Sequence, residues 1–254
     1  MTHPPVRYSC RAVLFLIVIG LFSGCATTGG SGDPRDPYEG FNRSVTDFND
    51  YMNEQFFEPV GETYNDITPD FLDRGITNFF SNLDDVSVIV NDILQFKLGQ
   101  AVSDIARVVF NTTIGIGGFF DVSTVMGLPR HNEDFGQTLA VWGSGSGPYL
   151  VIPLFGPSTV RDVAGFGVDT ALFSPLMYVI DDRITRTGLM TLAVIDFKAD
   201  LLGTEQLIKE AALDPYEFTK DAFFQRRNNQ IHDRGMTEYP FEDDLYFEED
   251  MDEL

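Results

Sequence analysis

Histidine and acidic side chains are the first candidates for metal or acid–base chemistry in this sequence. His131 and His232 lie far apart in the chain, and neither has a cysteine nearby, which excludes a zinc site of ordinary ligand spacing. The run 131–134 (His-Asn-Glu-Asp) could bind a cation, but a polar turn is the favoured interpretation. The acids Asp84 and Asp85 are expected on the solvated face of a helix, and nothing marks them as an acid–base couple. We therefore predict no metal site, no catalytic residues and no cofactor.

Glycine-rich segments are the next candidates, because they can cradle a phosphate or present a nucleophile. The run 143–147 (Gly-Ser-Gly-Ser-Gly) is not a nucleophile elbow, which needs serine in its third place, where Gly145 stands. The run 115–120 (Gly-Ile-Gly-Gly-Phe-Phe) lacks the last glycine of the dinucleotide fingerprint, and no Walker A sequence occurs. The sequence therefore argues against an enzyme. A serine hydrolase that uses a serine of the 143–147 run with His131 remains the enzymatic alternative.

Cys25 is the strongest candidate for a modified residue. Two arginines precede an uninterrupted apolar run, 12–19, which is too short for a permanent membrane span of ~20 residues. The small Ser-Gly pair directly before the cysteine is typical of a lipoprotein signal, although Phe22 stands where such signals usually have leucine. We predict a signal peptide over residues 1–24 and lipid attached to Cys25, with an ordinary signal peptide as the alternative.

The cysteine count also bears on anchoring. Cys10 would be removed with the signal, so Cys25 would be the only thiol of the mature chain and no disulfide can form. Two or more acyl chains anchor a protein stably, at about 0.8 kcal/mol per buried CH₂, so residue 25 is expected to stay at a membrane. The next residue is Ala26 rather than aspartate, which by analogy with enteric bacteria indicates delivery to the outer membrane.

Charge and composition exclude some partners and leave others open. With 17 Lys and Arg against 39 Asp and Glu, the chain carries a net charge of −22, which excludes nucleic-acid binding by charge and adhesion to an anionic leaflet through basic patches. The 23 phenylalanines and the hydrophobic fraction of 43% fit a protein that rests in a membrane interface. A phenylalanine-rich globular core fits them equally well.

Hydrophobic periodicity predicts the elements that must position these residues. A small, polar tether over 25–35 is followed by amphipathic segments with apolar residues every three or four positions. The expected helices are 41–56 closed by Pro59, 70–97, 100–112, 182–202, 204–213, and one from the N-cap Asp214 to about Asn229. The glycine- and proline-rich middle, 113–160, is predicted to form short helical turns and loops. No mature segment is apolar enough to span a membrane, and the acidic tail, 231–254, is predicted to be disordered, with docking on a basic partner as the alternative.

Five segments, in order along the chain, carry a resemblance to a known family. They are 36–43 (DPYEGFNR), 78–83 (NFFSNL), 111–121 (NTTIGIGGFFD), 127–139 (GLPRHNEDFGQTL) and 142–162 (WGSGSGPYLVIPLFGPSTVRD). On these segments the chain resembles the MlaA (VacJ) family of outer-membrane lipoproteins over a domain of residues 36–230. The long last segment is the most specific of the five.

The resemblance implies a fold and a function. Such proteins are all-α, with a ring-like arrangement of amphipathic helices that lies in the inner leaflet around a central amphipathic channel. They take phospholipid mislocalised in the outer leaflet, pass it to a soluble periplasmic carrier, MlaC, and in enteric members sit beside trimeric porins. The outer membrane, phospholipid, a porin and MlaC are therefore the expected partners. A structural lipoprotein that braces a porin or the envelope without moving lipid is the alternative.

Within that fold, two groups of residues are candidates for the lipid path. The candidates for a loop that shapes or gates the channel are Gly143, Gly145 and Gly147. The candidates for channel lining are Asn78, Ser81, Asn82, Arg107 and Arg161. The glycines could instead form a tight turn, and the polar helix face could simply meet water. The two arginines could meet lipid phosphate, and Arg161 could equally pair with Asp162.

Overall fold

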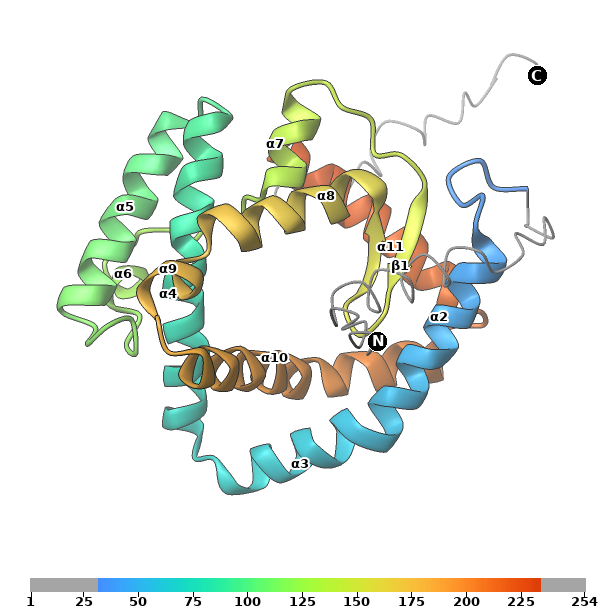
Figure 1. Ribbon diagram of the computed structural model, residues 1–254, viewed down its shortest axis with the longest axis horizontal. Helices are drawn as coiled ribbons and strands as arrows, with labels where there is room; N and C mark the ends of the chain where they lie inside the picture. The colour runs from blue at the N-terminus through green and yellow to red at the C-terminus, as the bar shows by residue number, and fades with distance from the viewer. Residues whose placement is uncertain (1–31, 234–254) are drawn as a thin grey trace, which may run out of the picture.

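Helices of very different length surround an opening in the computed structural model, which describes residues 32–233 (Figure 1). The elements in chain order are α2 (Glu39–Met52), η1 (Asn53–Phe57), α3 (Glu58–Ile67), α4 (Asp70–Leu94), α5 (Leu98–Thr113), α6 (Val122–Val125), α7 (Phe135–Val141), β1 (Tyr149–Ile152), β2 (Gly156–Thr159), α8 (Val160–Val168), η2 (Asp169–Phe173), α9 (Pro175–Val179), α10 (Arg183–Ala211) and α11 (Pro215–Ile231). In the view of Figure 1, α4, α8, α10 and the β1–β2 hairpin border the opening. The expected ring-like, mainly helical arrangement is confirmed. The predicted signal peptide, Cys25 and the tail beyond residue 233 lie outside the described residues.

The first helical segment does not end at Pro59, so that prediction is wrong. α2 passes into the π-helical turn η1 and then into α3, which makes one continuous segment from Glu39 to Ile67. At this turn the N–H of Glu58 bonds the carbonyl of Asn53, five residues back. A π turn widens the backbone and shifts the carbonyl that a proline ring would otherwise meet, so Pro59 is tolerated at the start of α3.

α4 and α5 form a helical pair at one side of the ring (Figure 1), and the predicted helices 70–97 and 100–112 are confirmed with shifts of a few residues at their ends. Three residues join the two helices, and the middle one, Phe96, has a φ of 61°. The pair is held in part by polar contacts, since the Asn82 amide of α4 donates to the Thr112 hydroxyl of α5 at 3.0 Å. The face of α4 that meets α5 is therefore a polar one.

The middle third of the chain contains short helices and one pair of short strands. Each short helix begins after a residue whose side chain accepts a hydrogen bond from the backbone N–H three positions later. These N-cap residues are Asp121 for α6, Asp134 for α7 and Thr159 for α8. β1 and β2 pair antiparallel, with Tyr149 opposite Thr159. The β1 sequence Tyr-Leu-Val-Ile favours a strand. The predicted all-α fold class is confirmed, and this hairpin is a small addition to a ring that is otherwise built of helices.

The predicted helices 182–202 and 204–213 are one helix, α10, so the predicted break is wrong. Gly203 is open to solvent, where a glycine costs only about 1 kcal/mol of helix stability, and the side chains on both sides of it are anchored. Ala199 packs against Gly61 of α3, and Glu205 pairs with Lys198. The predicted start of α11 is confirmed, because the Asp214 carboxylate accepts from the N–H groups of Tyr216 and Glu217.

Polarity is inverted across most of the ring. Among the described residues, 24 buried side chains are polar or charged and only eight are apolar. Large apolar side chains are instead exposed, among them Phe96, Val102, Ile116 and Val179. The small apolar core lies where the hairpin meets α2 and α11. Between residues 32 and 233, none of the helices combines the length and the hydropathy that a membrane span requires.

Candidate functional site

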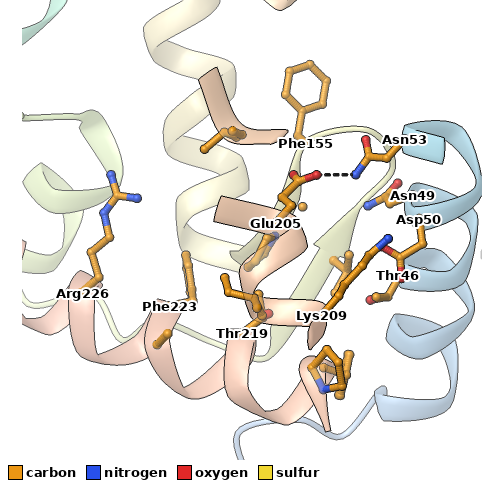
Figure 2. A pocket seen from close by; sticks show the side chains of 18 of the residues that line it. Thr46, Asn49, Asp50, Asn53, Phe155, Glu205, Lys209, Thr219, Phe223 and Arg226 are labelled. Carbon is orange, nitrogen blue, oxygen red and sulfur yellow. Dashed lines mark hydrogen bonds and ion pairs between the residues drawn. The ribbon is translucent and has the colours of Figure 1, made fainter. Parts of the chain in front are cut away.

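A cavity of about 580 Å³ lies between α2, the β1–β2 hairpin, α10 and α11 (Figure 2), and it is called the ring cavity below. One part of its wall is apolar, formed by Val151 and Phe155 of the hairpin, Phe197 and Leu201 of α10, and Phe223 of α11. The rest of the wall is polar and charged. The cavity therefore has the two-sided character that an amphiphile needs.

Lys198 and Glu205, about two helical turns apart on α10, connect this helix to η1 across the cavity wall. The Lys198 ammonium donates to the Asn53 amide oxygen at 3.1 Å and pairs with Glu205 at 3.3 Å. The Asn53 amide nitrogen donates in turn to Glu205 at 2.8 Å, as Figure 2 shows. The three side chains thus satisfy one another, and the charge of Lys198 is compensated.

The charge of Lys209 is also compensated by acids. This residue lies about one helical turn beyond Glu205 on α10. Its ammonium lies 3.3 Å from the carboxylate of Asp50 and 3.4 Å from that of Glu54. Burial opposes its charge, but these two acids outweigh burial and raise the pKa of Lys209. Lys209 therefore holds α10 to the helical segment α2–η1.

Arg227 and Arg226 are neighbours on α11 with different surroundings. The buried Arg227 guanidinium pairs with Asp134 at the start of α7 and with Asp162 of α8, at 2.7 and 2.8 Å. Burial disfavours the charge of Arg227, but the two carboxylates outweigh it and raise its pKa. Arg226 is exposed and lines the cavity, and it has no hydrogen bond or ion pair with any residue from 32 to 233. Arg227 is thus a structural residue, whereas Arg226 is free of partners within this part of the chain.

Comparisons with known proteins agree with this architecture. The family model described as MlaA lipoprotein matches residues 34–230. The chain belongs to the MlaA lipoprotein family. Over 213 residues it is 34% identical to the intermembrane phospholipid transport system lipoprotein MlaA of Escherichia coli, covering 82% of this chain and 83% of that one.

Other relatives and a solved structure extend the comparison. An uncharacterized protein of Rickettsia bellii is 31% identical over 210 residues, which cover 83% of this chain and 82% of the relative. A solved structure described as the structural basis for maintenance of bacterial outer membrane lipid asymmetry matches with a TM-score of 0.68 and 33% identity, covering 77% of this chain and 98% of the other. The MlaA fold is therefore shared along almost the whole matched domain.

Four of the predicted lining residues of this MlaA family member lie together, between α4 and α5. Asn78, Ser81, Asn82 and Arg107 surround a small pocket of about 40 Å³. The Asn78 amide donates to the Phe119 carbonyl at 3.3 Å, so it holds α4 against the glycine-rich loop after α5. Their role in lining a lipid path stays a prediction.

Arg107 is almost completely buried in this pocket. Its guanidinium donates to the Leu128 carbonyl at 2.7 Å and pairs with Asp121 at 3.2 Å. Burial opposes the charge of Asp121, but the Thr124 hydroxyl and N–H, Asn111 and Arg107 lower the pKa of Asp121 to about 2. Arg107 therefore connects α5 to the segment 121–128, and its predicted contact with lipid phosphate stays a prediction.

Arg161 and the three glycines lie apart from that pocket. The Arg161 guanidinium is paired with its neighbour Asp162 at 2.9 Å. Gly143 and Gly147 have φ values of 93° and 69°. Residues with a side chain rarely adopt such values, so the loop after α7 requires glycine at these two positions. Gly145 is surrounded by open space. A gating role for the three glycines stays a prediction.

Asp85, His131 and the serines of the 143–147 run all have structural partners. Asp85 is buried beside Arg130 at 3.3 Å, so its expected place on a solvated helix face is wrong. The reason is that the segment around residue 130 covers this side of α4. His131 bonds the Asp104 carboxylate of α5 at 2.8 Å, whereas the Ser144 and Ser146 hydroxyls bond carbonyls of their own loop. No group of three metal-ligating side chains occurs between residues 32 and 233.

Sequence reasoning missed the cavity and its charged wall. Lys198, Lys209 and Arg226 carry no spacing signal, because they come from two helices that are brought together only by the closure of the ring. A weak signal did exist: basic residues are rare in this acidic chain, and those on helices near the C-terminus could have been singled out for that reason.

Proposed function

We propose that this MlaA family member removes phospholipid from the outer leaflet of the outer membrane and passes it to a soluble periplasmic carrier. The observation that carries the proposal is the inverted polarity of the ring. Most of its buried side chains are polar or charged, many large apolar side chains are exposed, and a cavity with one apolar and one charged wall lies between its helices. A charged headgroup is costly in hydrocarbon, and a ring of this kind lowers that cost.

We also propose that the protein lies in the outer membrane, anchored by lipid on Cys25 and embedded from the periplasmic side. Its exposed apolar side chains support embedding in one leaflet, because helices with one apolar face can lie in the interface without spanning the bilayer. A trimeric porin beside the ring and the carrier MlaC below it complete the proposed assembly. The direction of lipid transport follows from the spaces to which the ring opens. A ring open to the outer leaflet above and to the periplasm below lets misplaced lipid move down without an energy source.

The test is the amount of phospholipid exposed in the outer leaflet of intact cells, measured with the gene present, deleted, and restored as the Cys25→Ala form. We expect excess surface phospholipid in the deletion strain, corrected by the parent gene and not by Cys25→Ala. An unchanged surface in the deletion strain contradicts lipid removal and favours a lipoprotein that braces a porin or the envelope. Lipid movement in both directions in a reconstituted system contradicts the proposed direction.

A further inference from the structure

The charges that line the ring cavity are compensated with one exception. Four basic side chains face it: Lys198, Lys209, Arg226 and Arg227. Three of these pair with acids at 3.3 Å or less, whereas Arg226 pairs with no residue between 32 and 233. Within the described residues, Arg226 therefore leaves one uncompensated positive charge at the cavity of a chain whose net charge is −22.

The free guanidinium also has an apolar neighbour in the same cavity. Phe223 lies about one helical turn before Arg226 on α11, and Phe197 and Phe155 complete the apolar wall. Figure 2 shows the Arg226 side chain extending away from α11, with no interaction drawn to any other residue of the view. A ligand that fills this cavity would therefore meet one cation and several apolar surfaces.

This combination fits a diacyl lipid with a phosphodiester. A guanidinium presents a planar set of N–H donors that matches two oxygens of a phosphate, and it remains charged at any physiological pH. We propose that Arg226 binds the phosphate of the phospholipid headgroup inside the ring cavity, with the acyl chains against the apolar wall. This inference rests on the proposed function and gives the lipid path a specific anion-binding residue. The phosphate alone could come from a soluble compound, but the apolar wall favours the lipid.

The test compares two fluorescent probes that share their acyl chains and differ only in the headgroup, a phosphatidylglycerol and a diacylglycerol. Their affinities for the full-length protein purified in detergent are measured for the parent, Arg226→Gln and Arg183→Gln. Arg183 is the matched control, because it is exposed, unpaired among residues 32–233, and lies at the far end of α10 from the cavity. Since Arg226 has no structural partner in that range, Arg226→Gln is expected to melt at the parent temperature.

We expect Arg226→Gln to weaken binding of the phosphatidylglycerol probe about tenfold, since a charge-assisted hydrogen bond is lost, and to leave diacylglycerol binding within about twofold. Arg183→Gln should leave both affinities unchanged. Millimolar glycerophosphoglycerol, the soluble headgroup, should not displace the probe. Displacement by this compound would overturn the lipid as the ligand and leave a soluble phosphate in its place.

Two other results separate this inference from the proposed function. If the parent prefers the phospholipid probe and Arg226→Gln binds it equally well, the phosphate is held elsewhere and only the inference is overturned. If the parent binds neither probe and deletion of the gene leaves surface phospholipid unchanged, the proposed function itself is overturned.

Discussion

Asn42 shows how single polar side chains hold distant segments of this ring together. It is completely buried in α2, where its amide nitrogen donates to the Asp36 carboxylate at 2.8 Å and to the Tyr149 carbonyl at 3.0 Å. Its amide oxygen accepts from the N–H of Val151 at 3.0 Å. One side chain thus joins α2, the segment before it and the edge of β1.

Asn42→Ala should leave these buried groups without partners. We expect the free energy of unfolding to fall by about 2–3 kcal/mol, or roughly 5–10 °C in melting temperature for a domain of this size. Thermal melting in detergent measures this. Ser44→Ala on the same helix is the control, because its exposed hydroxyl only bonds the Gly40 carbonyl within α2. Equal melting temperatures for the two variants would contradict a structural role of Asn42.

Asp92 is a second buried polar residue, and its carboxylate has no hydrogen-bond donor within the described residues. Both of its carboxylate oxygens are buried, and neither accepts a hydrogen bond from any donor among residues 32–233. Burial, assisted by the nearby carboxylate of Asp104, raises the pKa of Asp92 to about 8. A proton on Asp92 at neutral pH would give this side chain a donor that it can direct at Asp104.

This raised pKa predicts a dependence of stability on pH. The folded state holds the Asp92 proton more tightly than the unfolded state, so this contribution is complete below about pH 4, near the unfolded pKa, and is lost as the pH rises through about 8. We expect Asp92→Asn to match the parent at pH 4.5 in melting temperature and to exceed it at pH 8.5 by at least about 3 °C, which corresponds to roughly 1 kcal/mol. A constant difference between the two proteins at both pH values would show that Asp92 does not titrate in this range.

At the scale of elements, the crossing of α7 and α8 depends on two glycines in direct backbone contact. A Cβ on Gly165 of α8 would lie within van der Waals overlap of the Gly136 backbone of α7, with the Gly136 Cα at 2.7 Å. Backbone atoms cannot turn aside as a flexible side chain can. The two helices must therefore separate if Gly165 is replaced.

Gly165→Ala should accordingly destabilise the fold by about 1–3 kcal/mol through overpacking. Gly167→Ala is a close control, because it lies two residues further along α8 and an added methyl group there would meet nothing within 4 Å. There, alanine should be neutral or stabilise the helix by up to about 1 kcal/mol. Denaturant or thermal unfolding of both variants measures the contrast, and a loss of stability from Gly167→Ala as large as that from Gly165→Ala would refute this account of the crossing.

The helices that could be predicted from the sequence are those whose signals are local. Strong apolar periodicity predicted α4 and α5, and the Asp-Pro pair predicted the start of α11, because these signals are local. The continuation through Pro59 depends on a π turn, which has no strong local signal. The hairpin depends on the pairing of β1 with β2, whose sequence Gly-Pro-Ser-Thr does not favour a strand. For the site, the polar face of α4 was predicted, whereas Arg226 could not be, because the cavity exists only after α2, α10 and α11 meet.

The molecule as a whole presents an apolar outer surface on α5. Val102 and Ile105, three residues apart on this helix, are 67% and 44% exposed, and Leu98 and Val109 continue the same face. Water is a poor solvent for such a face, and membrane hydrocarbon is a good one. This part of the ring is therefore expected to contact lipid acyl chains.

Acidic residues on that face should weaken membrane association. The test uses the Cys25→Ala form, which lacks the proposed anchor, and measures its flotation with phospholipid vesicles. We expect the double change Val102→Asp and Ile105→Asp to reduce the vesicle-bound fraction at least about tenfold, since an aspartate costs about 2.5–3.5 kcal/mol at the centre of a membrane helix and less near the interface. Asn228→Asp, on the exposed polar surface of α11, should float like its parent. Unchanged flotation of the double variant would place α5 outside the membrane.

α10 has a mechanical consequence for the whole ring. It is a single helix of 29 residues, about 43 Å long, and in Figure 1 it runs from α4 on one side to α11 and the hairpin side on the other. It therefore acts as a strut whose length fixes the span between these two sides. Removing one turn of about four residues would shorten that strut by about 5–6 Å, and the ring would have to narrow by a similar amount or break the ties of Lys198 and Lys209 to the opposite helix.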